Sequence, residues 1–332
     1  MIMINAPVRP RPEAVTAEGL AKSYGDKAVL DGIDLHIPQG TVFALLGPNG
    51  AGKTTTVQIL STLIPASAGR ARVAGHDLLR EAGAVRAAIG VTGQFSAVDN
   101  LLDARENLLL MADLHHLDRR EGRRRAGALL DRFELTEAAA RPVATFSGGM
   151  RRKLDLAMTL VGRPRLIFLD EPTTGLDPRS RRTMWEIIRS LVADDGVTVF
   201  LTTQYLEEAD QLADRIAVLD HGKLVAEGTA DELKRQIPGG HLRLRLAGPS
   251  ELAAAAALFP SAARDDDALT LDIPGDSGIP ALRAVLDTLD RASVRAEALT
   301  VHTPGLDEVF LTLTDRTPQS GAAVNSLQEN AR

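Results

Sequence analysis

The fold of this chain is decided by the stretch Gly47-Pro48-Asn49-Gly50-Ala51-Gly52-Lys53-Thr54, which fits the pattern G-x-x-x-x-G-K-[ST]. An apolar run precedes it at residues 41–46, and a segment of helical character follows it at 55–60. Glycines allow successive backbone N–H groups to curl around an anion, and the start of the following helix adds a partial positive charge. The order strand, glycine loop, helix therefore predicts a site that holds the phosphates of a nucleotide.

Two side chains of this loop have distinct expected roles. Lys53 would reach the β- and γ-phosphates, and the hydroxyl of Thr54 would ligate Mg²⁺. The residues expected to contact the nucleotide are Gly47, Pro48, Asn49, Gly50, Ala51, Gly52, Lys53, Thr54 and Thr55. By itself the loop predicts a nucleoside triphosphate with Mg²⁺ and does not name the reaction.

Composition and charge exclude several classes of protein. The 332 residues leave room for one large domain and a smaller one, and 44% hydrophobic with 25% charged residues is typical of a globular protein. A net charge of -6 gives no reason to expect nucleic acid as a partner. The chain has no Cys, which excludes disulfides, thiolate metal sites and Cys nucleophiles and fits a reducing cytoplasm.

The sequence does not predict a membrane-spanning segment. No apolar run approaches the ~20 residues that such a helix needs. The first residues, which pass into a Pro/Arg-rich stretch, lack the apolar core of a signal peptide. We therefore expect that the chain does not cross a membrane by itself, although it could dock on a protein that does.

Changes in composition and periodicity along the sequence divide the chain into four expected parts. Pro7, Pro10 and Pro12 predict a flexible leader. The four parts are this leader at residues 1–14, a nucleotide-binding domain at 15–238, a small domain at 241–315 and a disordered tail at 316–332. Apart from the leader, the boundaries rest on periodicity and on Gly/Pro-rich or polar stretches between periodic segments.

In the nucleotide-binding domain, strand patterns alternate with helical patterns. The expected strands lie at 15–20, 29–37, 41–46, 71–75, 165–171 and 197–203, with a hairpin through 216–228. Between about residues 95 and 160 the sequence shows no strand pattern. Its apolar residues instead follow helical spacing at 104–117 and 120–133. This order predicts an α/β fold with a mostly parallel sheet covered on both faces, into which a helical subdomain is inserted.

The sequence of the C-terminal part predicts a separate small α/β domain. Its expected order is strand 241–246, helix 250–258, strand 268–273, helix 279–291, strand 294–301 and helix 306–313. It contains no glycine loop, no clustered His and no paired carboxylates of catalytic spacing. We expect binding or regulation from it and no chemistry.

Two adjacent carboxylates stand at the end of the apolar strand 165–171. Asp170 can hold Mg²⁺, usually through water, and Glu171 can polarise an attacking water molecule. The alternative is a pair of acids that only solubilises a turn. Downstream of a phosphate-binding loop, the pair predicts nucleotide hydrolysis, with Glu171 as the catalytic base.

Two further features have both a structural and a functional interpretation. Ser147-Gly148-Gly149 at the start of a helix is either a plain helix N-cap or an anion clamp without a lysine. Tyr24, one of two tyrosines, is either a turn aromatic that packs locally or a platform on which an adenine ring stacks. The residues alone leave both choices open.

Several of these motifs together resemble those of ATP-binding-cassette (ABC) ATPases. Ser147-Gly148-Gly149-Met150-Arg151 looks like the LSGGQ-type signature, and Gly175-Leu176-Asp177 resembles the D-loop. Gln94 stands where the Q-loop glutamine of that family stands, and Tyr24 where its adenine-stacking aromatic does. The resemblance covers residues 15 to 230, with the motifs in the family's order.

The resemblance implies a fold, ligands and partners. The expected fold is a P-loop NTPase cassette of the ABC type, with a parallel-sheet core, an antiparallel β edge and a helical subdomain. It also implies ATP as substrate, Mg²⁺ held by Thr54, Gln94 and Asp170, and a contact from Asp177. Two copies are expected to pair head-to-tail, so that Ser147, Gly148 and Gly149 of one copy cap the ATP in the loop of the other.

One position departs from the general family pattern. Where the family usually has a switch histidine that contacts the γ-phosphate, this chain has Gln204. Glutamine can donate a hydrogen bond but carries no charge and cannot shuttle a proton. This leaves Glu171 as the base and predicts a slow or differently regulated ATPase, with Gln204 as the second catalytic candidate.

Four stretches narrow the resemblance to the daunorubicin/doxorubicin-resistance type of ABC ATPase, in which Gln204 looks like a group trait. They are residues 147–155, 202–210, 214–218 and 305–311. This implies a subunit at the cytoplasmic face of a bacterial membrane that powers a separately encoded permease exporting hydrophobic drugs or antibiotics. The ATPase would not bind the cargo directly, and it would meet the permease around residues 95–106.

Other functions stay open. The same ATPase could serve export of a lipid or a polysaccharide. A soluble regulatory or DNA-repair ATPase is a second alternative, against which the single cassette, the lack of heptads and the lack of a basic groove argue. A drug-sequestering protein is a third, but one Trp and two Tyr offer little aromatic surface for planar drugs.

Overall fold

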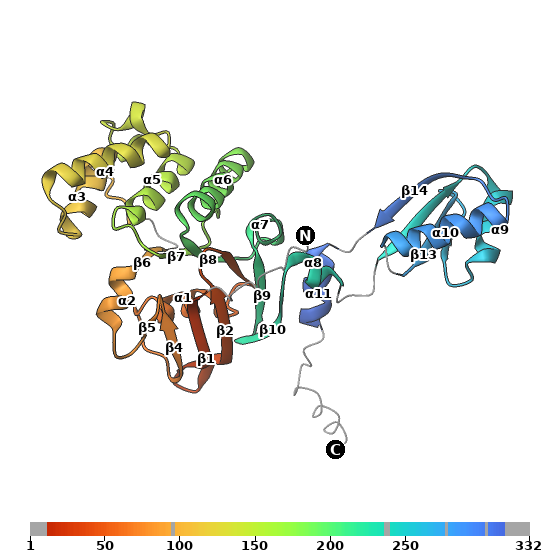
Figure 1. Cartoon of the computed structure of the whole chain (residues 1–332), viewed down its shortest axis with the longest axis horizontal. Coiled ribbons are helices and arrows are strands. Elements are labelled where there is room, and N and C mark those ends of the chain that lie inside the picture. Colours follow the sequence, from red (N-terminus) through yellow and green to blue (C-terminus); the bar gives the residue numbers. More distant parts are fainter. Residues whose placement is uncertain (1–11, 94–96, 236–239, 276–277, 303–304, 316–332) are drawn as a thin grey trace, which may run out of the picture. The chain divides into compact units, whose positions relative to one another are not determined.

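The computed structural model describes residues 12–93, 97–235, 240–275, 278–302 and 305–315, apart from the side chains of the last three (Figure 1). The chain divides into two units, Met1–Ala230 and Asp231–Arg332, which we treat separately. The predicted tail and most of the predicted leader lie outside the described residues. Among the helices described, none combines the length and the apolar character needed to span a bilayer.

The first unit is built on a six-stranded sheet in the order β10-β9-β3-β8-β7-β6. Its strands are β3 (Val42–Leu46), β6 (Ile89–Thr92), β7 (Leu166–Asp170), β8 (Thr198–Thr203), β9 (Arg215–Asp220) and β10 (Lys223–Gly228). All neighbours are parallel except β9 and β10, which form the predicted hairpin. Strands β3, β7 and β8 are buried along their whole length because both faces are covered, which explains their continuous apolar runs.

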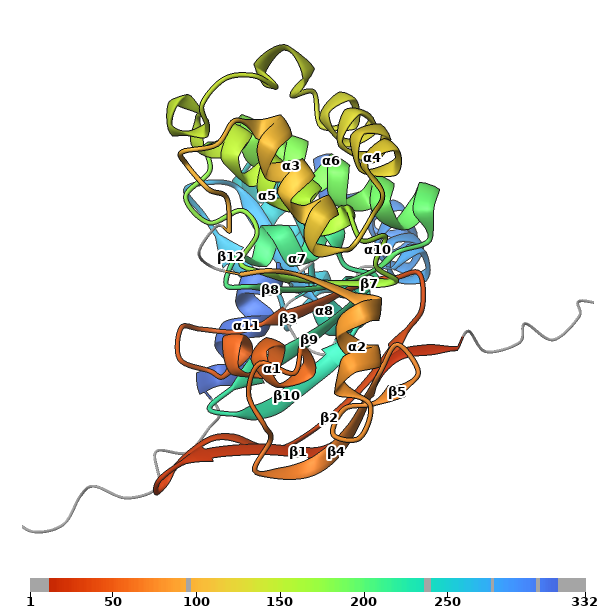
Figure 2. The same cartoon turned by 90° about the vertical axis from the view of Figure 1, so that its left-hand side faces the viewer.

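A second sheet, antiparallel and four-stranded, has the order β2-β1-β4-β5. Its strands are β1 (Glu13–Tyr24), β2 (Lys27–Pro38), β4 (Ala68–Val73) and β5 (His76–Asp77). Helix α1 (Lys53–Leu60) lies between the two sheets (Figure 2), and residues of both sheets and of α1 form one buried apolar cluster. Helix α2 (Ala82–Ala88) also contributes to this cluster.

Helices cover the other face of the six-stranded sheet. The helices on that side are α3 (Ala104–Leu114), α4 (Arg119–Arg132), α5 (Gly148–Leu160), α6 (Pro178–Asp195) and α7 (Leu206–Leu212), with two short 3₁₀ turns at Thr136–Ala138 and Val143–Thr145. Of these, α5, α6 and α7 pack on the strands. Four of the helices begin at residues whose side chains accept backbone N–H bonds: Asp103, Asp118, Ser147 and Asp177. Helices α3 and α4 pack on α5 (Figure 1) and form the predicted helical subdomain.

The second unit is a small antiparallel sheet with helices on it. Its elements are α8 (Ala230–Arg235), β11 (His241–Leu246), α9 (Pro249–Leu258), β12 (Ala263–Asp265), β13 (Thr270–Pro274), α10 (Ile279–Arg291), β14 (Ala296–His302) and α11 (Leu306–Asp315). The strand order is β12-β13-β11-β14, and the alternating Leu242, Leu244 and Leu246 lie in its core.

The predicted α/β class, the parallel core, the antiparallel edge and the helical insertion are confirmed. Among the elements that the sequence did not predict are β5, β12 and α2. Strand β12 (Ala263–Asp265) is exposed at all three positions, so it has no apolar alternation to reveal it. The helix after the phosphate loop runs from Lys53 to Leu60.

Candidate functional site

The glycine loop lies between β3 and α1, as predicted. Gly50 and Gly52 have φ of 84° and 113°, which are costly for other residues. A Cβ atom on Gly47 would lie 2.3 Å from the backbone oxygen of Leu219, and the Gly47 N–H donates to the oxygen of Thr203 over 3.2 Å. The loop is therefore held closely against β8 and β9, and these positions require glycine.

Lys53 extends into the space that the loop encloses. Its Nζ donates to the carbonyl oxygens of Gly47 (2.8 Å) and Pro48 (3.1 Å) and lies 3.6 Å from Oε1 of Glu171. Only 5% of the side chain is exposed. Burial lowers the pKa of Lys53, and the carboxylate of Glu171 opposes that effect. The positive charge is thus fixed where an anion in the loop would meet it.

Thr54 and Asp170 come together at the other side of the loop. The Thr54 hydroxyl donates to Oδ1 of Asp170 over 3.3 Å, and the Thr202 hydroxyl donates to the same oxygen over 2.5 Å. Asp170 is buried at the end of β7. A hydroxyl and a carboxylate that share one small space are ligands that suit Mg²⁺. The donor set therefore fits the predicted metal.

Glu171 is held in an unusual backbone conformation, with φ of 50°. Its N–H donates to the backbone oxygen (3.2 Å) and the hydroxyl (3.1 Å) of Thr202, and its Oε2 accepts from the Thr174 hydroxyl over 3.2 Å. Left-handed backbone at a residue other than glycine costs energy and concentrates at functional sites. The bonds from neighbouring residues hold the carboxylate next to Lys53.

A cavity of about 540 Å³ opens over the loop. Its lining includes seven of the predicted residues, Asn49, Gly50, Gly52, Lys53, Thr54, Thr55 and Glu171. It also includes five that the sequence did not single out, Lys27, Ala28, Val29, His221 and Gly222. A volume in this range is typical of a small-ligand site.

The turn at Gly222 reaches the loop from the far end of the first unit's sequence. Its N–H donates to the oxygen of Ala51 over 3.0 Å, and its own oxygen accepts from the N–H of Asp31 over 2.9 Å. A Cβ on Gly222 would lie 2.5 Å from the oxygen of Val29. The hairpin was predicted, but nothing in the local sequence ties its turn to the phosphate loop.

Tyr24 does not belong to this lining. It is the last residue of β1, its side chain is 52% exposed, and Nζ of Lys22 lies 4.9 Å from the ring centroid. The structure therefore shows an accessible aromatic ring that already carries one cation contact. A role in stacking on adenine stays a prediction.

The signature residues and the D-loop residue lie side by side, apart from the loop cavity's lining. The Ser147 hydroxyl accepts the Met150 N–H over 3.2 Å and caps α5. Asp177 caps α6, accepting from the N–H of Ser180 over 3.0 Å and from its hydroxyl over 2.6 Å. A Cβ on Gly149 would lie 2.7 Å from that same hydroxyl oxygen. Ser147 is exposed, and its O–H remains available as a donor.

Arg152 is a structural link that sequence reasoning missed. Its guanidinium donates to the backbone oxygens of Pro172 (2.9 Å), Gly93 (3.0 Å), Asp170 (3.2 Å) and Glu171 (3.3 Å). Burial lowers its pKa, while Asp155 at 3.2 Å raises it. The helix that begins at Gly148 is thereby tied to the segment that carries Asp170 and Glu171. Nothing in the sequence around Arg152 indicates these long-range contacts.

Glu208 was also missed. It is fully buried in α7, and its Oε1 accepts from the Thr173 hydroxyl (2.7 Å) and the indole N–H of Trp185 (3.1 Å). Burial raises its pKa. Gln204, four residues earlier, is half-buried directly after β8, and its side chain has no hydrogen bond to any described residue. Gln94 lies outside the described residues.

Comparison with known proteins gives the same family that the motifs indicated. The family model described as ABC transporter matches residues 30–174. A daunorubicin resistance ATP-binding protein of Streptomyces coeruleorubidus is 52% identical over 303 residues, which cover 91% of this chain and 96% of that protein. The daunorubicin/doxorubicin resistance ATP-binding protein of Streptomyces peucetius is 47% identical, covering 91% and 92%. A Nod factor export ATP-binding protein of Paraburkholderia xenovorans is 38% identical, covering 93% and 99%.

Solved structures match about two thirds of the chain. The ATP-binding subunit of an ABC transporter superposes with a TM-score of 0.60 at 29% identity, covering 67% of this chain and 92% of that one. A dimeric ATP-binding cassette bound to ADP and phosphate superposes with a TM-score of 0.59 at 26% identity, covering 65% and 98%. The cassette fold, the phosphate loop with its two acids and these identities agree: the chain belongs to the ABC transporter family, as an ATP-hydrolysing subunit of the daunorubicin/doxorubicin-resistance type.

Proposed function

We propose that this chain hydrolyses ATP to power export of a hydrophobic drug or antibiotic through a separately encoded membrane permease. The supporting observation is the grouping of Lys53, Glu171, Thr54 and Asp170 at one loop, in a chain that resembles resistance ATP-binding proteins along 91% of its length. The cargo need not touch this chain. We expect the subunit to work as a peripheral protein at the cytoplasmic face of a bacterial membrane.

In the proposed mechanism, the loop binds the phosphates and Lys53 turns from the carbonyls of Gly47 and Pro48 to the β- and γ-phosphates. The remaining loop residues position the nucleotide, and Tyr24 stacks on adenine. Glu171 accepts the proton of the attacking water. Mg²⁺, held by Thr54, Asp170 and Gln94, would stabilise the charge that develops on the transferred phosphoryl group.

The site is proposed to be completed by a second copy of the chain. The Ser147 hydroxyl and the N–H groups of Gly148 and Gly149 form a donor set that does not line the loop cavity of its own chain; Ser147 and Gly148 are exposed, and Gly149 is partly exposed. In a head-to-tail homodimer they would cap the γ-phosphate in the partner's loop, with Asp177 beside them. The second unit, whose described residues contain no comparable donor set, is proposed to serve binding or regulation.

Export is tested by expressing the chain with the permease encoded beside its gene in a drug-sensitive bacterium. We expect survival and efflux of a hydrophobic drug with the unaltered chain and neither with Lys53→Ala, at equal protein levels. Export of a lipid or polysaccharide without any drug efflux would instead support the second candidate, export of another cargo, which the resemblance to a Nod factor export ATP-binding protein favours.

Gln204→His is expected to raise the rate of hydrolysis by roughly three- to tenfold, because histidine can carry charge and move a proton at this position. Gln204 makes no described hydrogen bond, so the exchange should leave the fold intact. Phosphate release by the purified variant measures the effect, with Gln211→His on the exposed face of α7 as control. An unchanged rate would refute the idea that Gln204 limits turnover.

A further inference from the structure

Glu208 is a buried acid to which the proposed mechanism assigns no role. It lies in the first turn of α7, and none of its surface is exposed. Burying a carboxyl group is costly unless hydrogen bonds replace those that it makes with water. The partners that replace them come from two other segments, the loop that follows Glu171 and helix α6. The group therefore stands where three segments of the first unit meet.

One oxygen of this carboxyl group accepts two hydrogen bonds. Oε1 accepts from the Thr173 hydroxyl over 2.7 Å and from the indole N–H of Trp185 over 3.1 Å. Oε2 is buried and has no hydrogen bond to any residue that the structure describes. Burial raises the pKa of Glu208, and the neighbouring donors oppose that effect. The contribution of this group to its surroundings is therefore concentrated in Oε1.

The bond from Thr173 anchors the short segment that carries Glu171. Thr173 is fully buried, and its hydroxyl donates to Glu208 as described above. Only Pro172 stands between it and Glu171, and the proline ring fixes one of the two backbone angles of that residue. A shift of Thr173 is therefore passed on to Glu171.

Glu171 depends on such support because its backbone is strained. A φ of 50° at a residue other than glycine persists only where the surrounding structure holds it from several sides. On the N-terminal side, the Glu171 N–H bonds to Thr202. On the C-terminal side, two side chains hold the segment, Arg152 from α5 and Glu208 from α7.

Helix α7 connects this support to the phosphate loop. The Tyr205 N–H, at the start of the helix, donates to the Thr203 hydroxyl over 2.9 Å, and the Thr203 oxygen accepts the N–H of Gly47 over 3.2 Å. Glu208 follows about one turn later on the same helix. Its bond to Thr173 therefore links the segment that carries the proposed base to the strand end that holds the phosphate loop.

We propose that Glu208 is a positioning residue for ATP hydrolysis. Through the Thr173 hydroxyl it holds the carboxylate of Glu171 where that group can accept the proton of the attacking water. Glu208 does not line the loop cavity and acts only through its neighbours. A displacement of about 1 Å at a reacting group can cost about 10²-fold in rate, so the link affects kcat and not ATP binding. The inference rests on the proposed function, in which Glu171 is the base.

Thr173→Val removes the hydroxyl and keeps the shape of the side chain. We expect kcat to fall by about tenfold or more, with the KM for ATP changed by less than about twofold, because the phosphate loop is untouched. Thr173→Ser keeps the hydroxyl and should hold kcat within about threefold of normal. Phosphate release by the purified chain at varied ATP concentration measures both constants.

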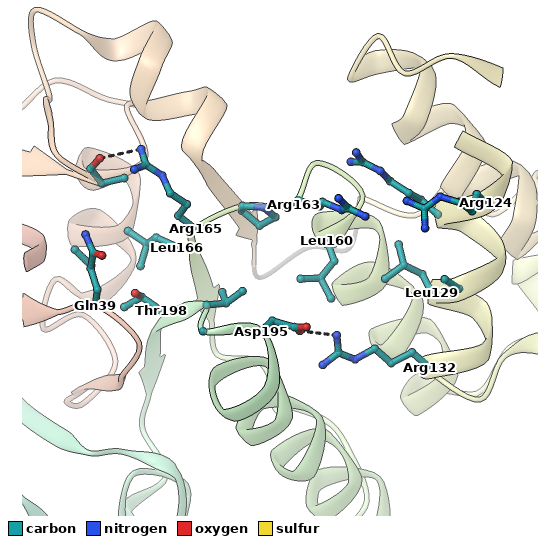
Figure 3. A pocket seen from close by; sticks show the side chains of 17 residues that line it. Gln39, Arg124, Leu129, Arg132, Leu160, Arg163, Arg165, Leu166, Asp195 and Thr198 are labelled. Atoms are coloured by element: carbon teal, nitrogen blue, oxygen red, sulfur yellow. Dashed lines mark hydrogen bonds and ion pairs between the residues drawn. The ribbon is translucent and has the colours of Figure 1, made fainter. Parts of the chain in front are cut away.

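Thr198→Val is the matched control for lost stability. Thr198 is also buried, and its hydroxyl accepts the N–H of Gly40 over 3.0 Å. It is the first residue of β8, at the end opposite to Thr203, where it lines a separate cavity of about 600 Å³ (Figure 3). The change should lower the thermal stability because it leaves the Gly40 N–H without this acceptor, but kcat should stay within about twofold of normal.

Glu208→Leu removes the acceptor and tests whether the two residues act as a pair. We expect a loss of kcat of about tenfold or more, again at nearly constant KM. A chain with both Glu208→Leu and Thr173→Val should lose no more than the larger of the two single losses, because both changes break the same link. Circular dichroism checks that each variant is folded, and the Thr173 variants decide the question if Glu208→Leu is not.

A normal kcat for Thr173→Val would overturn the proposal. The same holds if Thr198→Val loses kcat to the same extent, if KM rises while kcat is unchanged, or if the losses multiply in the double variant. The proposed function is tested separately by Glu171→Gln. A normal rate in that variant would remove the base itself, whereas an inactive Glu171→Gln beside a fully active Thr173→Val would count against the positioning role alone.

Discussion

Replacing Glu171 by glutamine is expected to lower ATP hydrolysis by about 10²- to 10⁴-fold and to leave ATP binding unchanged. The amide cannot accept a proton from the attacking water, whereas Lys53 and the loop glycines, which hold the phosphates, are untouched. The backbone N–H of residue 171 keeps both of its bonds to Thr202, so the unusual conformation at φ 50° is preserved. Phosphate release and binding of a fluorescent ATP analogue measure the two effects.

The same variant should accumulate as a dimer when ATP and Mg²⁺ are present, because bound ATP that is not cleaved continues to join the two copies. Light scattering after size separation gives the mass directly. Glu186→Gln, an exposed change on α6, is the matched control and should hydrolyse ATP at the normal rate. A Glu171→Gln variant that retains the normal rate would remove Glu171 from the mechanism.

Ser147→Asp is expected to abolish hydrolysis, by about 10²-fold or more, while a single chain still binds ATP in its loop. Aspartate is as good an N-cap as serine, so α5 should keep the bond that the Met150 N–H now makes over 3.2 Å. The new carboxylate would meet the γ-phosphate of the partner's ATP and repel it.

Ser147→Asn separates charge from shape in this experiment. Asparagine also caps a helix, is neutral and can donate a hydrogen bond, so its rate should stay within about tenfold of the normal rate. Both variants should show the same thermal stability. An aspartate variant as active as the asparagine variant would exclude a phosphate contact at Ser147.

The parts of the fold that were predicted are those in which local pattern carries the information. The phosphate loop is one contiguous motif, and Leu166–Asp170 reads as a buried strand because every residue in it is apolar until the acid. The exposed strand β12 (Ala263–Asp265) carries no such pattern. Its existence depends on pairing with β13, which a local reading does not contain.

The parts of the site that were missed depend on contacts between distant residues. Gly222 touches Ala51 and Val29 only because β9 and β10 fold back against the loop. Arg152 reaches Gly93 and Asp170 across the first unit, and Glu208 meets Thr173 and Trp185 from another helix.

The central claim is that each ATP is held by the loop of one copy and the signature of another, and cross-linking tests it most directly. The chain has no Cys, so Asn49→Cys and Ser147→Cys each introduce a single thiol, and both positions are exposed. The two variants, each also carrying Glu171→Gln, are mixed with ATP and Mg²⁺ and treated with a short bifunctional thiol reagent. The account predicts a covalent dimer that joins the two variants and depends on ATP. Absence of that species, or the same yield without ATP, would contradict it.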